Sequence, residues 1–124
     1  ELLSDWKAAA WNEGLKMRTG RWNIAGKPIV VLIDFTPLFS RKDDIFTKLW
    51  EKFKLDSLHG QWDYIESTMF GYAAGQVVES LSHFRGNNEM VTVAHFHEWM
   101  TATGILYLKQ SAPQIGTAFT THAT

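Results

Sequence analysis

The sequence contains no cysteine among its 124 residues. It therefore has no disulfide framework and no thiolate site, and its redox compartment stays undetermined. It also lacks an excess of either charge, because 12 Lys and Arg stand against 13 Asp and Glu, which argues against nucleic acid as a partner. No apolar run is long enough for a membrane span. What is abundant is aromatic residues, six tryptophans among them, in a chain long enough for one modest domain.

The spacing of apolar residues predicts helices alternating with strands. Helices are expected over residues 4–13, 40–54, 63–84 and 98–110, and strands over 29–33, 90–94 and 115–121, with a further strand or hairpin over 15–24. The runs 29–33 and 90–94 are typical of strands that are buried on both faces. This order predicts an α/β fold, namely a Rossmann-like, open and mainly parallel sheet with flanking helices and an antiparallel element from 15–24 at one edge.

Two local features of the predicted helices are a candidate N-cap and a pair of glycines. Ser40 is a plausible N-cap of the helix over 40–54. Gly71 and Gly75 lie inside the longest predicted helix, where each costs about 1 kcal/mol relative to alanine. The pair therefore predicts close approach of another backbone, and tight packing of this helix on the sheet is the favoured explanation.

Both ends of the chain look cut. Glu1 begins inside a helical pattern, and Thr124 follows an apolar strand with no closing element. We therefore expect a fragment of a longer protein.

Polar side chains follow the predicted strands at their carboxyl ends, where open parallel sheets bind ligands. These are Asp34, His97 and His122. If the strands over 90–94 and 115–121 are neighbours, His97 and His122 face one crevice. The alternative is that both histidines merely satisfy backbone groups of loops, and Asp34 is at least as well suited to a turn.

A helix predicted to begin directly after His97 would add free backbone amides to this crevice. His95, Glu98 and His122 are ligands of the type that zinc prefers. The His-x-His spacing, however, stands at a strand-to-helix joint, where the two side chains need not converge, and the helical zinc signature is absent. We expect no metal, and we expect a structural role for His95.

Two segments of the sequence resemble a known family. Residues 93–99 (Val-Ala-His-Phe-His-Glu-Trp) and 119–124 (Phe-Thr-Thr-His-Ala-Thr) closely resemble the N-terminal domain of glycogen synthases of the animal and fungal type. Residues 20–34, beginning Gly-Arg-Trp, resemble a third segment of that domain. The two end motifs are specific, and their joint occurrence at this spacing is much stronger than either alone.

The resemblance implies a cytoplasmic glycosyltransferase of the GT-B architecture, with two Rossmann-like domains facing a cleft. Such an enzyme transfers glucose from UDP-glucose to the non-reducing 4-hydroxyl of an α-1,4-glucan with retention, and it needs no metal or other cofactor. By resemblance, His97 is the catalytic histidine of the cleft and contacts the sugar. Thr121 and His122 would bind substrate from the adjacent strand.

Large parts of the family pattern are missing here, among them the first strand, its Gly-Gly loop and the whole C-terminal domain with the catalytic glutamate. Residues 1–124 are therefore expected to form a single partial domain that is inactive alone, because half a cleft cannot position two sugars. A missing first strand would leave a sheet edge open, which favours a homo-oligomer. Two alternatives stay open: another GT-B glycosyltransferase with a different donor, such as ADP-glucose, and a non-catalytic α/β binding module.

Overall fold

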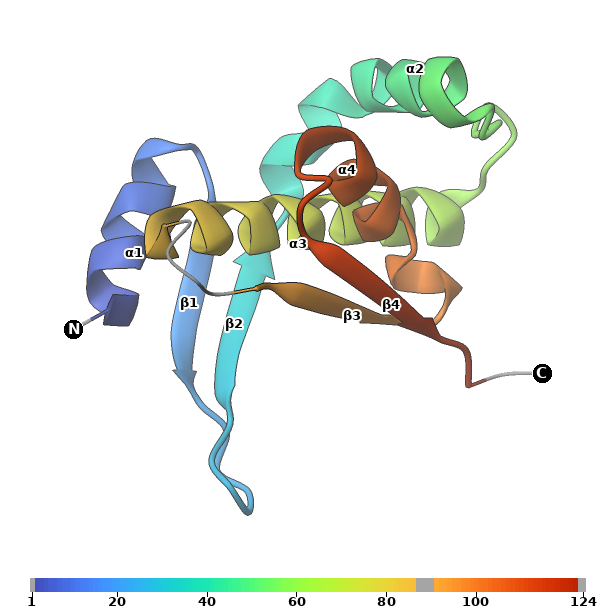
Figure 1. Cartoon of the computed structure of the whole chain (residues 1–124). Coiled ribbons are helices and arrows are strands. Elements are labelled where there is room, and N and C mark those ends of the chain that lie inside the picture. The colour runs from blue at the N-terminus through green and yellow to red at the C-terminus, as the bar shows by residue number, and fades with distance from the viewer. Residues whose placement is uncertain (1, 87–90, 123–124) are drawn as a thin grey trace. The chain divides into compact units, whose positions relative to one another are not determined.

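The computed structural model describes residues 2–86 and 91–122 and divides the chain into two compact units, Glu1–Asp34 and Phe35–Thr124. Within the described residues, each unit contains one two-stranded sheet, which is accompanied by one helix in the first unit and by several helices in the second (Figure 1). The fold is therefore mixed α/β, as the sequence predicts at this level.

The first unit is a helix followed by a β-hairpin. Helix α1 (Leu2–Asn12) precedes strands β1 (Lys16–Arg21) and β2 (Ile29–Asp34), which pair antiparallel. Gly14 ends the helix with a φ of +87°, a conformation that glycine adopts without steric cost. The helix and the antiparallel element over 15–24 confirm part of the prediction. The element does not lie at the edge of the parallel strands, however, because among the described residues β1 and β2 form a two-stranded sheet of their own.

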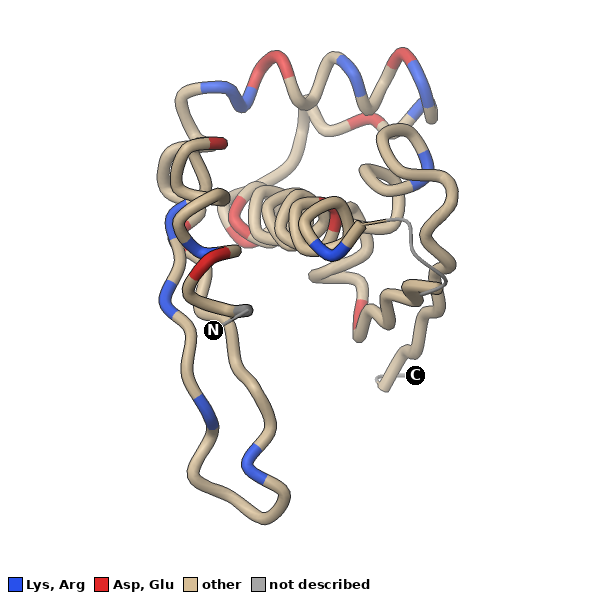
Figure 2. The backbone as a smooth tube through the Cα atoms, turned by 60° about the vertical axis from the view of Figure 1, so that its left-hand side comes forward, with Lys and Arg blue, Asp and Glu red and all other residues tan. Residues whose placement is uncertain are grey.

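Strand β2 is not buried on both faces, contrary to the prediction for residues 29–33. Ile29 is 50% exposed and Leu32 is 64% exposed. Among the described residues β2 pairs with β1 alone. The run of apolar residues in β2 therefore shows that the strand is apolar, but it does not show that other elements cover both of its faces. Residues 15–33 carry Lys and Arg but no Asp or Glu (Figure 2), and such charges disfavour pairing of an edge strand with another chain.

The second unit contains a pair of parallel strands joined by a helix. In chain order it consists of the 3-10 helix η1 (Thr36–Arg41), α2 (Lys42–Phe53), α3 (Trp62–Arg85), β3 (Val93–His97), the 3-10 helix η2 (Trp99–Thr101), α4 (Thr103–Ser111) and β4 (Gly116–Thr120). Strands β3 and β4 lie side by side and point the same way (Figure 1), which confirms the predicted parallel pair. No helix in the described ranges has the length and apolarity needed to cross a membrane.

Helix α2 begins later than predicted, and Ser40 does not cap it. The Ser40 hydroxyl donates to the carbonyl of Pro37 at 3.0 Å, while Arg41 occupies the N-cap position without a side-chain bond. Pro37 at the start of η1 explains the difference, because its fixed φ favours a helical turn ahead of the one that the sequence pattern marks.

Strand β3 is shifted along the sequence and is buried on one face only. It covers Val93–His97, whereas the prediction was 90–94, of which Met90 lies outside the described residues. Ala94 and Phe96 are buried, and His95 and His97 are exposed. The helix predicted over 98–110 begins only at Thr103, after Glu98 and η2.

One apolar cluster holds the strands against the helices. Ala94 and Phe96 of β3 pack with Leu108 of α4 and with Ala112 and Ile115. Partly buried Ala74 and Val78 of α3 contact the same cluster. Helices α3 and α4 therefore cover the same face of the strand pair, and the histidines of β3 project from the other face.

Helices α3 and α4 cross at glycines. A Cβ atom at Gly71 would lie 2.9 Å from the carbonyl oxygen of Thr101, and one at Gly75 would lie 3.1 Å from that of Gly104. The Thr103 hydroxyl donates to the carbonyl of Thr68 at 2.8 Å across the same contact. The predicted close approach is confirmed, but the partner is a helix and the turn before it, not the sheet.

We expect the pair Tyr107–Glu79 to make the protein sensitive to alkali. The Tyr107 hydroxyl donates to Glu79 Oε1 at 2.5 Å between α4 and α3. Burial, and then the Glu79 carboxylate, raise the pKa of Tyr107 above its ordinary 10.0. The unfolded chain thus loses this proton first, and stability falls as the pH rises past 10.0.

Tyr107→Phe should therefore cost about 1 kcal/mol of unfolding free energy at neutral pH. It should also flatten the loss of stability between about pH 8 and about pH 11. Denaturant unfolding at both pH values measures this, with Tyr64→Phe as the control. An equally steep loss in Tyr107→Phe and the unchanged protein would contradict the expectation.

Candidate active site

Two histidines meet at the carboxyl ends of the parallel pair, where His97 ends β3 and His122 follows β4 by two residues. Nδ1 of His97 lies 2.8 Å from Nε2 of His122, and the two rings are stacked with centroids 5.1 Å apart. One nitrogen must carry the proton and the other must accept it. The predicted juxtaposition of His97 and His122 at one edge is thus present, and it is a direct contact.

His95 and Thr120 extend this pair along the same face of the strands. The ring of His95 lies 4.3 Å from that of His97, and its Nε2 lies 2.8 Å from the Thr120 hydroxyl. The expectation that His95 and His97 straddle a strand-to-helix joint is wrong. Both belong to β3 at a spacing of two, so their side chains converge on one face.

Glu98 closes the network at the end of β3. Its backbone N–H donates to the carbonyl of Thr120 at 2.9 Å, and its carboxylate oxygen Oε1 accepts the backbone N–H of His122. Glu98 has φ +66° and ψ 159°, in the left-handed region that favours glycine. This turn, and not an α-helix N-terminus, follows His97, so the predicted helix amides are not at the site.

The remaining candidate residues are not among the histidine contacts described above. Thr121 is exposed between Thr120 and His122, and Thr120 is the threonine that contacts His95. His59 and His83 are exposed and lie in other parts of the second unit. Asp34 ends β2 in the first unit. In the described part of the chain, no three His, Asp or Glu side chains are arranged to hold a metal ion.

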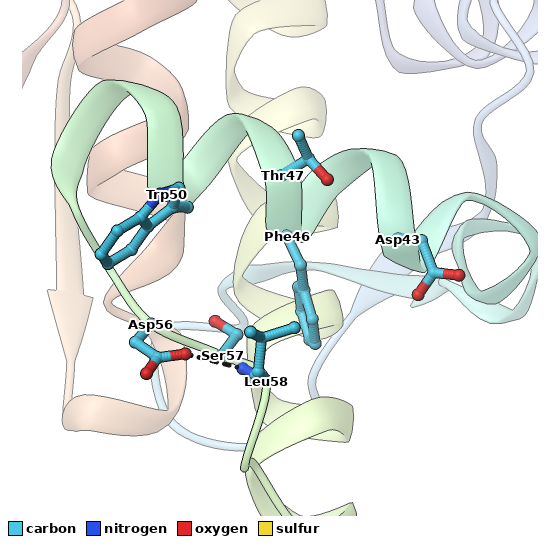
Figure 3. Close-up of a pocket in the computed structure, with 7 residues that line it drawn as sticks. All are labelled: Asp43, Phe46, Thr47, Trp50, Asp56, Ser57 and Leu58. Carbon is cyan, nitrogen blue, oxygen red and sulfur yellow. Dashed lines mark hydrogen bonds between the residues drawn. The ribbon is translucent and has the colours of Figure 1, made fainter.

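A separate pocket of about 400 Å³ lies between α2 and the loop that follows it (Figure 3). Phe46 and Leu58 lie close together in it, and Trp50 stands at one side above Asp56. Asp56 accepts the backbone N–H of Leu58 at 3.0 Å, so its carboxylate already organises the loop. This mainly apolar pocket contains none of the predicted site residues, and the histidine network stays the candidate site.

Comparison with known proteins identifies the family. The family model for glycogen synthase matches residues 3–124. This chain belongs to the glycogen synthase family. The resemblance of residues 93–99 and 119–124 is thereby confirmed over nearly the whole chain.

Curated members of the glycogen synthase family are similar along most of the chain. A glycogen [starch] synthase of Dictyostelium discoideum is 31% identical over 111 residues, covering 90% of this chain and 12% of the relative. One of Caenorhabditis elegans is 32% identical over 115 residues, which is 90% of this chain and 17% of the relative. The liver glycogen [starch] synthase of Rattus norvegicus is 32% identical over 112 residues, with coverage of 90% and 16%. The chain thus spans 12% to 17% of the length of these glycogen synthases.

Sequence reasoning missed Thr120 at this glycogen synthase segment, and it considered Glu98 only as a possible zinc ligand, not as the acceptor for the backbone N–H of His122. The spacing of His95 and His97 within a strand was the available signal for the shared face. Together with the register that pairs His97 with Thr120, that alternation would have placed the Thr120 hydroxyl on the face that His95 and His97 share. The role of the Glu98 carboxylate had no signal, because it depends on an unusual backbone conformation.

Proposed function

We propose that this chain is part of a glycogen synthase that transfers glucose from UDP-glucose to the non-reducing 4-hydroxyl of an α-1,4-glucan with retention. The observation that carries the proposal is the His97–His122 contact at the carboxyl ends of two parallel strands, in a chain of this family. The chain would be a partial Rossmann-like domain of a GT-B enzyme, with a mainly parallel sheet in the parent.

In this proposal His97 is the catalytic residue that touches the transferring sugar. An imidazole can donate a hydrogen bond to a sugar hydroxyl and stabilise charge at the reacting centre. His122 and Thr121 bind substrate from the neighbouring strand. Both histidine side chains are exposed on the face that the helices leave uncovered, so they are accessible to a ligand.

The remaining features of the proposal follow from the family. Its partners are the glucan acceptor and the nucleotide sugar, without a metal or other cofactor. We place the parent in the cytoplasm. The edges of the β3–β4 pair, which are open among the described residues, support self-association, whereas the Lys and Arg of the β1–β2 hairpin disfavour it there. Residues 1–124 alone would be inactive, because they supply one wall of a cleft that needs two.

The test is a transfer assay on the full-length protein with a glucan primer and a panel of nucleotide sugars. Incorporation of glucose from UDP-glucose, with little from ADP-glucose, is the expected result. Preference for another sugar donor would favour a different GT-B glycosyltransferase. Tight glucan binding with no transfer from any donor would favour the non-catalytic module.

A further inference from the structure

Glu98 adopts a backbone conformation that a glutamate enters only at a steric cost. Its φ of +66° and ψ of 159° lie in a region occupied almost only by glycine. The turn is tied on both sides, because its N–H donates to the Thr120 carbonyl and its own carbonyl accepts from the Thr101 hydroxyl at 3.2 Å. The Thr101 hydroxyl also donates to the carbonyl of His97 at 2.6 Å. A glycine would suit this backbone better, so the glutamate side chain needs a separate explanation.

The Glu98 carboxylate continues the β3–β4 ladder beyond its last backbone bond. That last bond joins the Glu98 N–H to the Thr120 carbonyl, and the next link joins Oε1 of Glu98 to the backbone N–H of His122. The carboxylate thus acts as the acceptor that a further strand residue would have supplied. As a result, His122 is held beside His97 although β4 has already ended at Thr120.

The position of His122 limits how the ring of His97 can turn. Nδ1 of His97 is engaged by Nε2 of His122 at 2.8 Å, and the ring of His95 has its centroid 4.3 Å from that of His97. Turning the His97 ring over would replace Nδ1 by a carbon and break the contact with His122. Because Nδ1 is held, Nε2 of His97 is the nitrogen left to address a ligand.

We propose that His122 and Glu98 are positioning residues for His97: the Glu98 carboxylate fixes His122, and the His122 ring fixes the orientation of the His97 ring. This inference rests on the proposed function and refines the role of His122. It gives His122 an effect on turnover, where a sugar-binding side chain would mainly affect substrate affinity.

The kinetic test uses the full-length protein and the variants His122→Ala, His122→Gln and Glu98→Gly. His122→Ala should lower kcat about 10- to 100-fold, with KM for the sugar nucleotide changed less than about threefold. His122→Gln, which can present a nitrogen at similar reach, should recover much of that loss. Glu98→Gly relieves the backbone but removes the carboxylate, so it should lower kcat without lowering Tm. The control is Glu66→Gln, an exposed carboxylate on α3.

Crystal structures of the same full-length variants provide a readout that does not depend on activity. The His97 ring should turn from its present orientation in His122→Ala and Glu98→Gly and keep it in His122→Gln. An unmoved ring in His122→Ala overturns the inference, as does a rise in KM with an unchanged kcat. If the protein transfers no glucose at all, the proposed function fails, and the ring orientation still decides the positioning roles.

Discussion

Replacing His97 with alanine in the full-length protein is expected to lower kcat for glucosyl transfer by about 10²- to 10³-fold. The physical reason is that the ring is already oriented by His122 and by its neighbour His95, so little reorganisation precedes the reaction. An exposed imidazole held in one orientation is suited to a fixed hydrogen bond with a substrate. Initial rates at saturating UDP-glucose and glucan measure the effect.

The matched control for His97→Ala is His83→Ala, since His83 is also exposed but lies on α3. It should leave kcat near the original value. The thermal midpoint of His97→Ala should stay within a few degrees of the unchanged protein, because the His97 side chain projects from the face opposite the apolar cluster. Full turnover in a folded His97→Ala protein would remove His97 from the mechanism.

Replacing Gly104 with alanine is expected to destabilise the protein by about 3 kcal/mol. The added Cβ would lie 2.3 Å from Cε1 of Phe96 and 2.7 Å from the carbonyl oxygen of Gly71. The Phe96 ring could shift, but the Gly71 carbonyl belongs to the backbone of α3. Helices α3 and α4 must therefore separate, which opens the contact between them. Denaturant unfolding measures the change.

Gly20→Ala is the appropriate control for Gly104→Ala. Gly20 lies in β1, and a Cβ there would meet nothing within 4 Å. The free energy of unfolding of Gly20→Ala should change little, because Gly20 has an ordinary φ and there is open space where the new Cβ would lie. The double variant Gly104→Ala with Phe96→Leu should recover only part of the loss, since it leaves the clash with Gly71 in place. Equal stability of Gly104→Ala and Gly20→Ala would show that the helix crossing yields easily.

Much of the fold follows from local patterns in the sequence. The four-residue ladder through Met69, Ala73 and Val77 identifies α3, and all three residues are buried. The apolar run around Ala94 and Phe96 identifies β3, although the predicted bounds were displaced. It was harder to predict which faces of these elements are covered by other parts of the chain. The apolar run 29–33, which is β-branched except at Leu32, indicated burial on both faces. Burial depends, however, on which other elements of the chain pack against the strand.

The site was predictable in part for the same reason. A strand-end rule places His97 and His122 at one edge without knowledge of side-chain geometry. The contact of His95 with Thr120 requires the register of β3 against β4, which no local pattern contains. The conformation of Glu98 is harder still to predict from the sequence. A positive φ is contrary to the backbone preference of glutamate and is imposed here by the surrounding structure.

Buried and exposed side chains alternate along the five residues of β3, so neighbouring positions are under different selective constraints, for stability and for chemistry. Ala94 and Phe96 face the helices, and a change there would be felt as lost stability. His95 and His97 face outward, and a change there would alter chemistry with little effect on folding. Mutations on the exposed face of β3 can therefore change substrate specificity while the residues of the buried face keep the fold stable. Adaptive change in such a segment is expected at every second position.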